Sequence, residues 1–250
     1  MMNEWKNKKI AFLGDSITEG VGTTVGERYL DYLNQSLEII PFCYGVNGAK
    51  YLDVFDQAQK LYAEHKSDVD CVFVAAGTND YNCSIPLGEF FTEQPADVIT
   101  LKTEDGKPEI IEKRKKREFD FSTDTFCGRI NRVFAFLKRN YPEAQIVVCT
   151  PIHRAFAEFS RDNIQYSELY TNGVGLYVED YVKKIREAAD VWSLDLIDLY
   201  RESGLFPLYD EYASRYFADF NSDRLHPSAG GHKRIAKTIE GHLKHILPLK

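Results

Sequence analysis

The sequence has no apolar run long enough to cross a membrane. Its apolar segments are short, and none approaches the roughly 20 residues that a membrane-spanning helix needs. The first of them, IAFLG at 10–14, is followed by Asp15 and is shorter than the apolar region of a secretory signal. We therefore expect no membrane span, and the cytoplasm as the default location.

Positive charge is also scarce. Lys and Arg number 31 against 38 Asp and Glu, which gives a net charge of −7. Nucleic-acid backbones and anionic lipid surfaces are bound by clustered positive charge, so we expect neither as a partner. The one dense basic run, KRKKRE at 113–118, is flanked by acids, and we interpret it as a solvated charged segment.

Cysteine is sparse and arranged in no recognisable framework. The chain has five cysteines, an odd number, and no Cys-x-x-Cys pair. Cys71 and Cys149 lie in strand-like runs, where cysteine behaves as a small hydrophobic residue. The six histidines show no H-E-x-x-H spacing. We expect five free thiols, no metal site and no cofactor.

What is present is an ordinary globular composition. The 250 residues are 44% hydrophobic and 28% charged. A domain of this length buries roughly 70–75% of the surface of its unfolded chain. No internal repeat, low-complexity tract or linker divides the sequence, so we expect one domain over residues 1–250.

Short apolar runs alternate with stretches of helical periodicity. The runs are nearly continuous in hydrophobicity, which is typical of parallel strands that are covered on both faces. Their positions are 8–14, 38–45, 69–77, 144–151 and 191–198. The helical stretches are 27–38, 51–65, 123–141, 175–190 and 228–247. This alternation predicts a doubly wound α/β fold with a mostly parallel five-stranded sheet and helices on both faces.

Two segments interrupt the alternation. Residues 83–122 form an insertion, in which VITLKTEDGKPEII offers two β-capable arms around Asp105-Gly106, so a β-hairpin is expected there. Residues 153–173 are polar and aromatic and read as a long connection after a strand. Long loops on α/β scaffolds often shape sites, and we expect this one to do so.

Chemically reactive side chains follow several of the predicted strands. Asp15 and Ser16 come after the first strand, Gly48 after the second and Asn79 after the third, while Asp223 and His226 precede the last helix. Loops at the carboxyl ends of parallel strands meet in one crevice. We therefore expect these residues to converge.

Together the residues supply the parts of an acyl-transfer site. A serine hydroxyl needs a base, which His226 can provide, and Asp223 three residues earlier can hold the imidazole tautomer. The backbone N–H groups of Ser16 and Gly48 and the Asn79 amide are candidate donors to an oxyanion. Each residue alone is better explained as a turn or helix-cap residue, and the joint pattern favours the chemistry.

Four short motifs carry a family resemblance. They are GDSIT around Ser16, GVNGA around Gly48, GTND around Asn79 and DRLHP at 223–227. The sequence resembles the SGNH hydrolases, also called GDSL-type esterases and lipases. The resemblance implies a flavodoxin-like three-layer α/β/α sandwich. It implies Ser16 as nucleophile, His226 as base and Asp223 as its partner, with an oxyanion hole made by Ser16, Gly48 and Asn79.

The sequence departs from the family pattern in two places. Ile17 stands where the family's motif has leucine. The 83–122 insertion follows Asn79 closely, so we expect it near the crevice, as a lid.

Other functions are less consistent with the motifs. The glycine-rich stretch at 14–22 lacks the lysine of a phosphate-binding loop, and Glu19 would repel a phosphate. The usual α/β-hydrolase elbow needs glycine at position 18, which is threonine. An acyltransferase with the same triad, and a non-catalytic carbohydrate- or partner-binding module, stay as alternatives.

The sequence thus predicts a serine-dependent hydrolase of carboxylic esters. Aromatic side chains and Arg154 in the 153–173 segment favour a small-acyl or sugar-linked ester over a long fatty chain. Candidate substrate-binding residues are Asp15, Tyr81 and Arg154. The substrate itself and the oligomeric state stay open.

Overall fold

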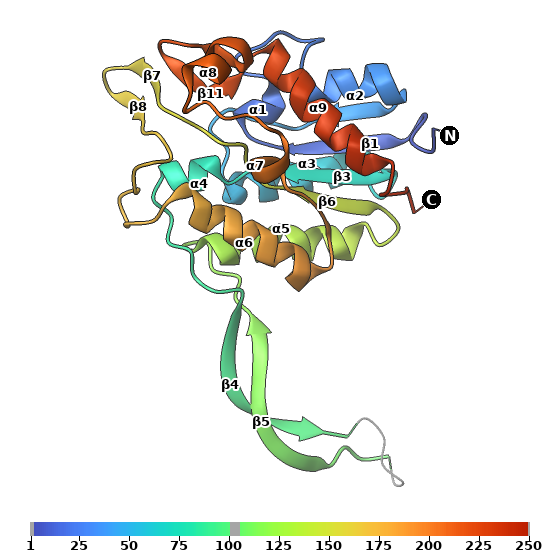
Figure 1. Cartoon of the computed structure of the whole chain (residues 1–250). Helices are drawn as coiled ribbons and strands as arrows, with labels where there is room; N and C mark the ends of the chain where they lie inside the picture. The colour runs from blue at the N-terminus through green and yellow to red at the C-terminus, as the bar shows by residue number, and fades with distance from the viewer. Residues whose placement is uncertain (1–2, 101–105, 250) are drawn as a thin grey trace.

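A parallel five-stranded sheet forms the centre of the molecule (Figure 1). The structure is a computed structural model that describes residues 3–100 and 106–249. The strand order is β2-β1-β3-β6-β9, which is the flavodoxin-like order. The strands are β1 Lys9–Gly14, β2 Ile40–Cys43, β3 Cys71–Ala75, β6 Gln145–Cys149 and β9 Asp195–Ile197. The predicted α/β fold class is therefore confirmed.

Helices cover both faces of this sheet (Figure 1). On one face, α2 Tyr29–Leu37 packs beside α9 Ala229–Leu243. The other face is covered by α3 Tyr51–His65, α5 Phe126–Asn140 and α6 Val178–Trp192. These five helices correspond to the five predicted helical stretches.

The alternation of side chains along β1 explains the continuous apolar runs. Ile10 and Phe12 are buried against α2 and α9, whereas Ala11 and Leu13 are buried against the opposite helical layer. Successive residues of a strand point to opposite faces. A sheet covered on both sides therefore needs apolar residues at every position.

The last predicted strand is shorter than expected. Val191 and Trp192 belong to α6, and only Asp195–Ile197 form β9. The indole of Trp192 donates to the side-chain oxygen of Asn131 on α5. This contact holds the end of α6 against α5, so the apolar residues there serve helix packing.

A second, antiparallel sheet lies beside the carboxyl ends of the parallel strands. Its order is β10-β11-β7-β8. The strands are β7 Ala157–Ser160, β8 Asn163–Gln165, β10 Phe217–Asp219 and β11 Asp223–Pro227. The sequence predicted 153–173 as a connection, and this was wrong for the β7–β8 hairpin. The side chains of β7 and β8 are mostly exposed and do not alternate between buried and exposed, so no apolar pattern in the sequence marks these strands.

The insertion forms a long two-stranded arm. Strands β4 Phe91–Ile99 and β5 Ile110–Phe119 pair antiparallel, which confirms a hairpin but places it over a longer stretch that includes KRKKRE. Of the predicted turn, Asp105 lies outside the described residues. At the base of the arm, Phe119 stacks on Trp192 with ring centroids 4.4 Å apart.

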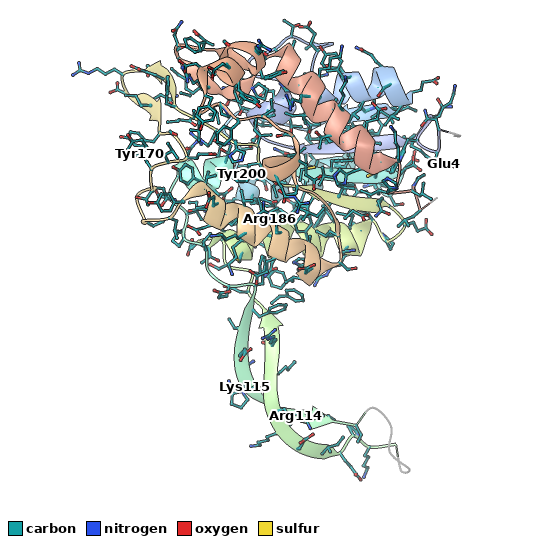
Figure 2. The ribbon with its side chains drawn as sticks, in the orientation of Figure 1. Glu4, Arg114, Lys115, Tyr170, Arg186 and Tyr200 are labelled. Atoms are coloured by element: carbon teal, nitrogen blue, oxygen red, sulfur yellow. The ribbon has the colours of Figure 1, made fainter. Side chains whose placement is uncertain are left out.

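The arm extends away from the body of the molecule (Figure 1). Figure 2 shows Arg114 and Lys115 on the projecting ribbon, clear of the helices. The lid expected from the sequence is therefore wrong for β4 and β5. Of the insertion's described residues, only Cys83 and Ser84, at its start, line the cavity near Asn79.

Four short helices complete the described part of the chain. They are α1 Ser16–Glu19, α4 Thr78–Asn82, α7 Leu199–Glu202 and α8 Asp210–Tyr216. Helices α1 and α4 begin directly beyond β1 and β3, at the carboxyl edge of the sheet. Within residues 3–100 and 106–249, no helix has the length and apolar character to cross a membrane.

Candidate active site

The turn from β1 into α1 places Ser16 at the carboxyl edge of the sheet. Asp15 caps α1 by accepting a hydrogen bond from the Ile17 N–H at 3.0 Å. Gly14 allows this close passage, because a Cβ there would lie 2.3 Å from the Thr18 hydroxyl and 2.5 Å from the Ala75 carbonyl oxygen. Ser16 is therefore displayed at the first position of a helix.

Ser16, His226 and Asp223 form one hydrogen-bonded chain. The Ser16 Oγ lies 3.0 Å from the His226 Nε2, although the residues are 210 positions apart. The His226 Nδ1 lies 2.8 Å from the Asp223 Oδ2. The three residues are 4%, 3% and 8% exposed, respectively. Such an arrangement lets the imidazole remove the serine proton while the carboxylate holds the ring.

A local turn within β11 brings Asp223 to His226. The Asp223 Oδ1 accepts hydrogen bonds from the backbone N–H groups of Leu225 and His226, at 3.1 and 3.0 Å. This leaves Oδ2 for the ring. Burial tends to raise the pKa of Asp223, but the hydrogen bonds and charge of His226 hold it below its ordinary value. The carboxylate is thus ionised when it meets the imidazole.

Strand β7 places an aromatic cover over the histidine. Asp223 pairs with Ala157 of β7. The ring of Phe159 lies 5.5 Å from that of His226 and is 43% exposed. The antiparallel sheet therefore holds β11 in position and also shields one side of the imidazole.

The candidate oxyanion donors lie on adjoining segments. Ser16 begins α1, so its N–H has no acceptor within the helix. The Asn79 Nδ2 donates to the Ala49 carbonyl at 3.0 Å, which ties α4 to the loop that holds Gly48. That loop is tied to α1, because the Asn47 N–H donates to the Glu19 carboxylate.

The backbone conformation requires glycine at position 48. A Cβ there would meet no protein atom within 4 Å, so packing against the protein does not exclude a side chain. The Gly48 φ of +78° is the actual requirement, because residues with a side chain adopt this conformation rarely. Gly48 and Asn79 line the same cavity of about 390 Å³.

Asp15 supports the turn and is 4% exposed. It lines a small internal cavity of about 30 Å³, apart from the open cavity beside Asn79. Burial raises the pKa of Asp15 to about 6, and the Ile17 N–H and His226 partly oppose this rise. The predicted contact between Asp15 and substrate has no support in this position.

An Asp15→Asn variant is expected to lose part of the pH dependence of stability. The raised pKa of Asp15 means that its stabilising contribution is full below about pH 3.8 and is lost as the pH rises through about 6. The shift corresponds to roughly 3 kcal/mol. Between pH 4 and 8, the free energy of unfolding of the wild type should therefore fall relative to that of the variant.

Denaturant unfolding of both proteins at the two pH values measures this difference. Any loss of stability that the asparagine causes equally at both pH values cancels when the two differences in unfolding free energy are compared. Asp56→Asn, which changes an exposed carboxylate, is the control. If the free energies of unfolding of wild type and Asp15→Asn differ by the same amount at pH 4 and pH 8, the raised pKa of Asp15 is contradicted.

Tyr81 and Arg154 are both buried, at 2% and 1% exposure. The Tyr81 hydroxyl donates to the Tyr170 carbonyl at 2.7 Å, and Tyr170 lies near β8 in Figure 2. The Arg154 guanidinium lies 5.3 Å from the Tyr81 ring centroid. Burial lowers the pKa of Arg154 to about 10, so it stays charged at neutral pH. Tyr81 lines the cavity. Arg154 does not line it, but its guanidinium donates hydrogen bonds to Asn82 and Gln165, which do.

Two polar residues of this region were absent from the sequence predictions. Asn82 and Gln165 line the cavity beside Asn79 and bond to Arg154. Asn82 lies three residues after Asn79, which was the available signal, but nothing local marks Gln165. Within the described ranges, no group of three His, Cys, Asp or Glu side chains is arranged to hold a metal ion.

Comparison with known proteins decides the family. The sequence profile of the GDSL-like Lipase/Acylhydrolase family matches residues 12–234. The chain belongs to this family. It is an ester-hydrolysing enzyme, and the catalytic triad and oxyanion hole are features of its family. No curated protein sequence matches this GDSL-like acylhydrolase.

Several solved structures share the fold. A Lactobacillus plantarum protein is 26% identical, covering 97% of this chain and 99% of its own, with a TM-score of 0.72. A G-D-S-L lipolytic protein from Veillonella parvula is 16% identical, covering 96% and 100%, with a TM-score of 0.59. A variant of an acetyl-xylooligosaccharide esterase from Geobacillus is 16% identical, covering 95% and 94%, with a TM-score of 0.57.

Proposed function

We propose that this enzyme hydrolyses carboxylic esters through an acyl-enzyme formed on Ser16. The observation that carries the proposal is the continuous chain of hydrogen bonds from Ser16 through His226 to Asp223. A buried serine bonded to a histidine, which is bonded to a carboxylate, is the arrangement that activates a hydroxyl for nucleophilic attack.

In the first half-reaction, the Ser16 oxygen attacks the ester carbonyl carbon. The His226 Nε2 takes the serine proton, and Asp223 stabilises the resulting imidazolium. The carbonyl oxygen becomes an oxyanion, which accepts hydrogen bonds from the Ser16 and Gly48 N–H groups and the Asn79 amide. The bond to the alcohol oxygen then breaks, and His226 protonates the departing alcohol.

In the second half-reaction, water replaces the alcohol. His226 takes a proton from water, and the hydroxide attacks the acyl carbon with the same donors holding the oxyanion. The bond to the Ser16 oxygen breaks, the acid leaves, and His226 returns a proton to the serine. The cycle needs no cofactor.

The substrate favoured by the site is a small-acyl or sugar-linked ester. The cavity beside Asn79 has amide and hydroxyl side chains in its wall, and none of the described residues that line it is charged. Uncharged polar groups suit a hydroxyl-bearing ligand better than a long alkyl chain, which would leave them without hydrogen-bond partners. The acetyl-xylooligosaccharide esterase from Geobacillus has the same fold, which is compatible with this choice.

A series of p-nitrophenyl esters from acetate to palmitate tests the proposal. We expect kcat/KM to be at least about tenfold higher for acetate than for palmitate, because burying a long chain against polar groups leaves those groups unpaired. A preference for palmitate would overturn the substrate class. No turnover of any ester by the folded enzyme would overturn the hydrolase itself.

A further inference from the structure

Within the described residues, the guanidinium of the buried Arg154 donates only to neutral oxygen atoms, whereas its backbone N–H donates to the Glu168 carboxylate. Its Nη1 donates to the Thr78 hydroxyl at 3.0 Å and to the Asn82 Oδ1 at 2.6 Å. Its Nη2 donates to the Gln165 Oε1 at 3.3 Å and to the Tyr166 carbonyl at 3.2 Å. Its Nε is buried without a partner in the described part of the chain. The guanidinium therefore joins both ends of α4 to β8.

This arrangement determines how two side-chain amides are turned. Arginine can only donate hydrogen bonds, so it must face the oxygen of the Asn82 amide. The Asn82 Nδ2 then points to Gln165 and donates to its Oε1 at 2.5 Å. Because Arg154 donates to the same Oε1, the Gln165 amide is held with its oxygen toward the protein.

The hydrogen bonds of the Gln165 side chain involve its oxygen and leave the Nε2 without a partner in the described part of the chain. Gln165 is partly exposed and lines the cavity of about 390 Å³ that Gly48 and Asn79 also line. A residue that lines the cavity next to the candidate oxyanion hole thus has two N–H groups without a protein acceptor among the described residues.

We propose that Gln165 is a specificity-determining residue that donates a hydrogen bond to an acceptor oxygen of the substrate, with Arg154 as the positioning residue that fixes its orientation. The substrate class is an ester whose alcohol or acyl group carries a hydroxyl, ether or carbonyl oxygen close to the ester bond. The proposal rests on the proposed ester hydrolysis at Ser16.

The physical basis is the cost of an unpaired donor. A site built to donate to a substrate oxygen rejects an analogue that lacks this oxygen, because the donor then loses its partner. Had Asn82 and Arg154 been absent, the Gln165 amide could turn and offer its oxygen instead. The network prevents this and makes the Gln165 position selective for acceptors.

Two esters of similar size test the proposal. One is tetrahydropyran-3-yl acetate, whose six-membered ring carries one ether oxygen, which accepts a hydrogen bond and cannot donate one. The other is cyclohexyl acetate, whose ring lacks this oxygen. For the wild type, we expect kcat/KM to be about tenfold higher for the ether ester, because one hydrogen bond separates the two.

Gln165→Glu replaces the amide nitrogen by an oxygen and keeps the acceptor for Arg154. The ratio of the two kcat/KM values should fall about tenfold, mainly through a higher KM for the ether ester, because a carboxylate has no proton to donate to an ether oxygen. An effect of the new charge on the oxyanion acts on both substrates and cancels in the ratio. Gln165→Met, which removes the donor without adding charge, should lower the ratio in the same way.

Gln94→Glu makes the same chemical change on the exposed arm and should leave the ratio unchanged. Arg154→Met should lower the ratio too, because the amide is then free to turn, and Arg154→Lys should restore part of it. A ratio that stays within about twofold of the wild type in both Gln165 variants, or a wild type without preference, overturns the proposal. If the wild type hydrolyses neither these esters nor p-nitrophenyl acetate, the proposed ester hydrolysis itself has failed.

Discussion

Replacing Ser16 by alanine is expected to lower kcat for p-nitrophenyl acetate by about 10⁴- to 10⁶-fold. Without the hydroxyl no acyl-enzyme can form, and His226 has no serine proton to remove. Some hydrolysis should persist, because the oxyanion donors can still stabilise direct attack by water. Steady-state kinetics on the purified variant measure the loss.

Two controls separate this loss from a folding defect. Ser36→Ala removes an exposed hydroxyl on α2 and should keep full activity. A fluorophosphonate, which reacts with activated serines, should label the wild type once and leave the Ser16→Ala variant unlabelled. Activity within tenfold of the wild type in a folded Ser16→Ala protein would remove Ser16 from the mechanism.

Asp223→Asn is expected to lower kcat by about 10⁴-fold at neutral pH. The asparagine oxygen can still accept from the Leu225 and His226 N–H groups, so the turn in β11 should survive. Its amide nitrogen, however, faces the His226 Nδ1 as a donor. The ring then carries its proton on Nε2 and cannot take the proton of Ser16.

The pattern of the loss distinguishes a tautomer effect from a structural one. The melting temperature and KM should change little, while kcat falls. Asp219→Asn, on the neighbouring strand β10, changes an exposed carboxylate that caps a turn and should leave kcat unchanged. A change in kcat below threefold in Asp223→Asn would mean that this carboxylate does not orient the histidine.

The local conformation of the nucleophile and oxyanion segments follows from their glycines. Gly14 admits the turn beside Thr18 and Ala75, and Gly48 supplies a φ of +78°. Both are requirements of short stretches of chain and are visible in the motifs. The motif showed the glycine at position 48, and the structure added its positive φ, because a motif does not record a backbone angle.

The sequence alone determined the parallel sheet, its covering helices and the set of residues that meet at its carboxyl edge. These follow from hydrophobic periodicity and from motifs in which each residue has a local chemical meaning. The tertiary structure alone decided the course of the arm, the β7–β8 hairpin and the role of Arg154. Arg154 acts through Asn82 and Gln165, whose contacts join segments distant in the chain, and no local pattern records which neutral oxygens a buried guanidinium will meet.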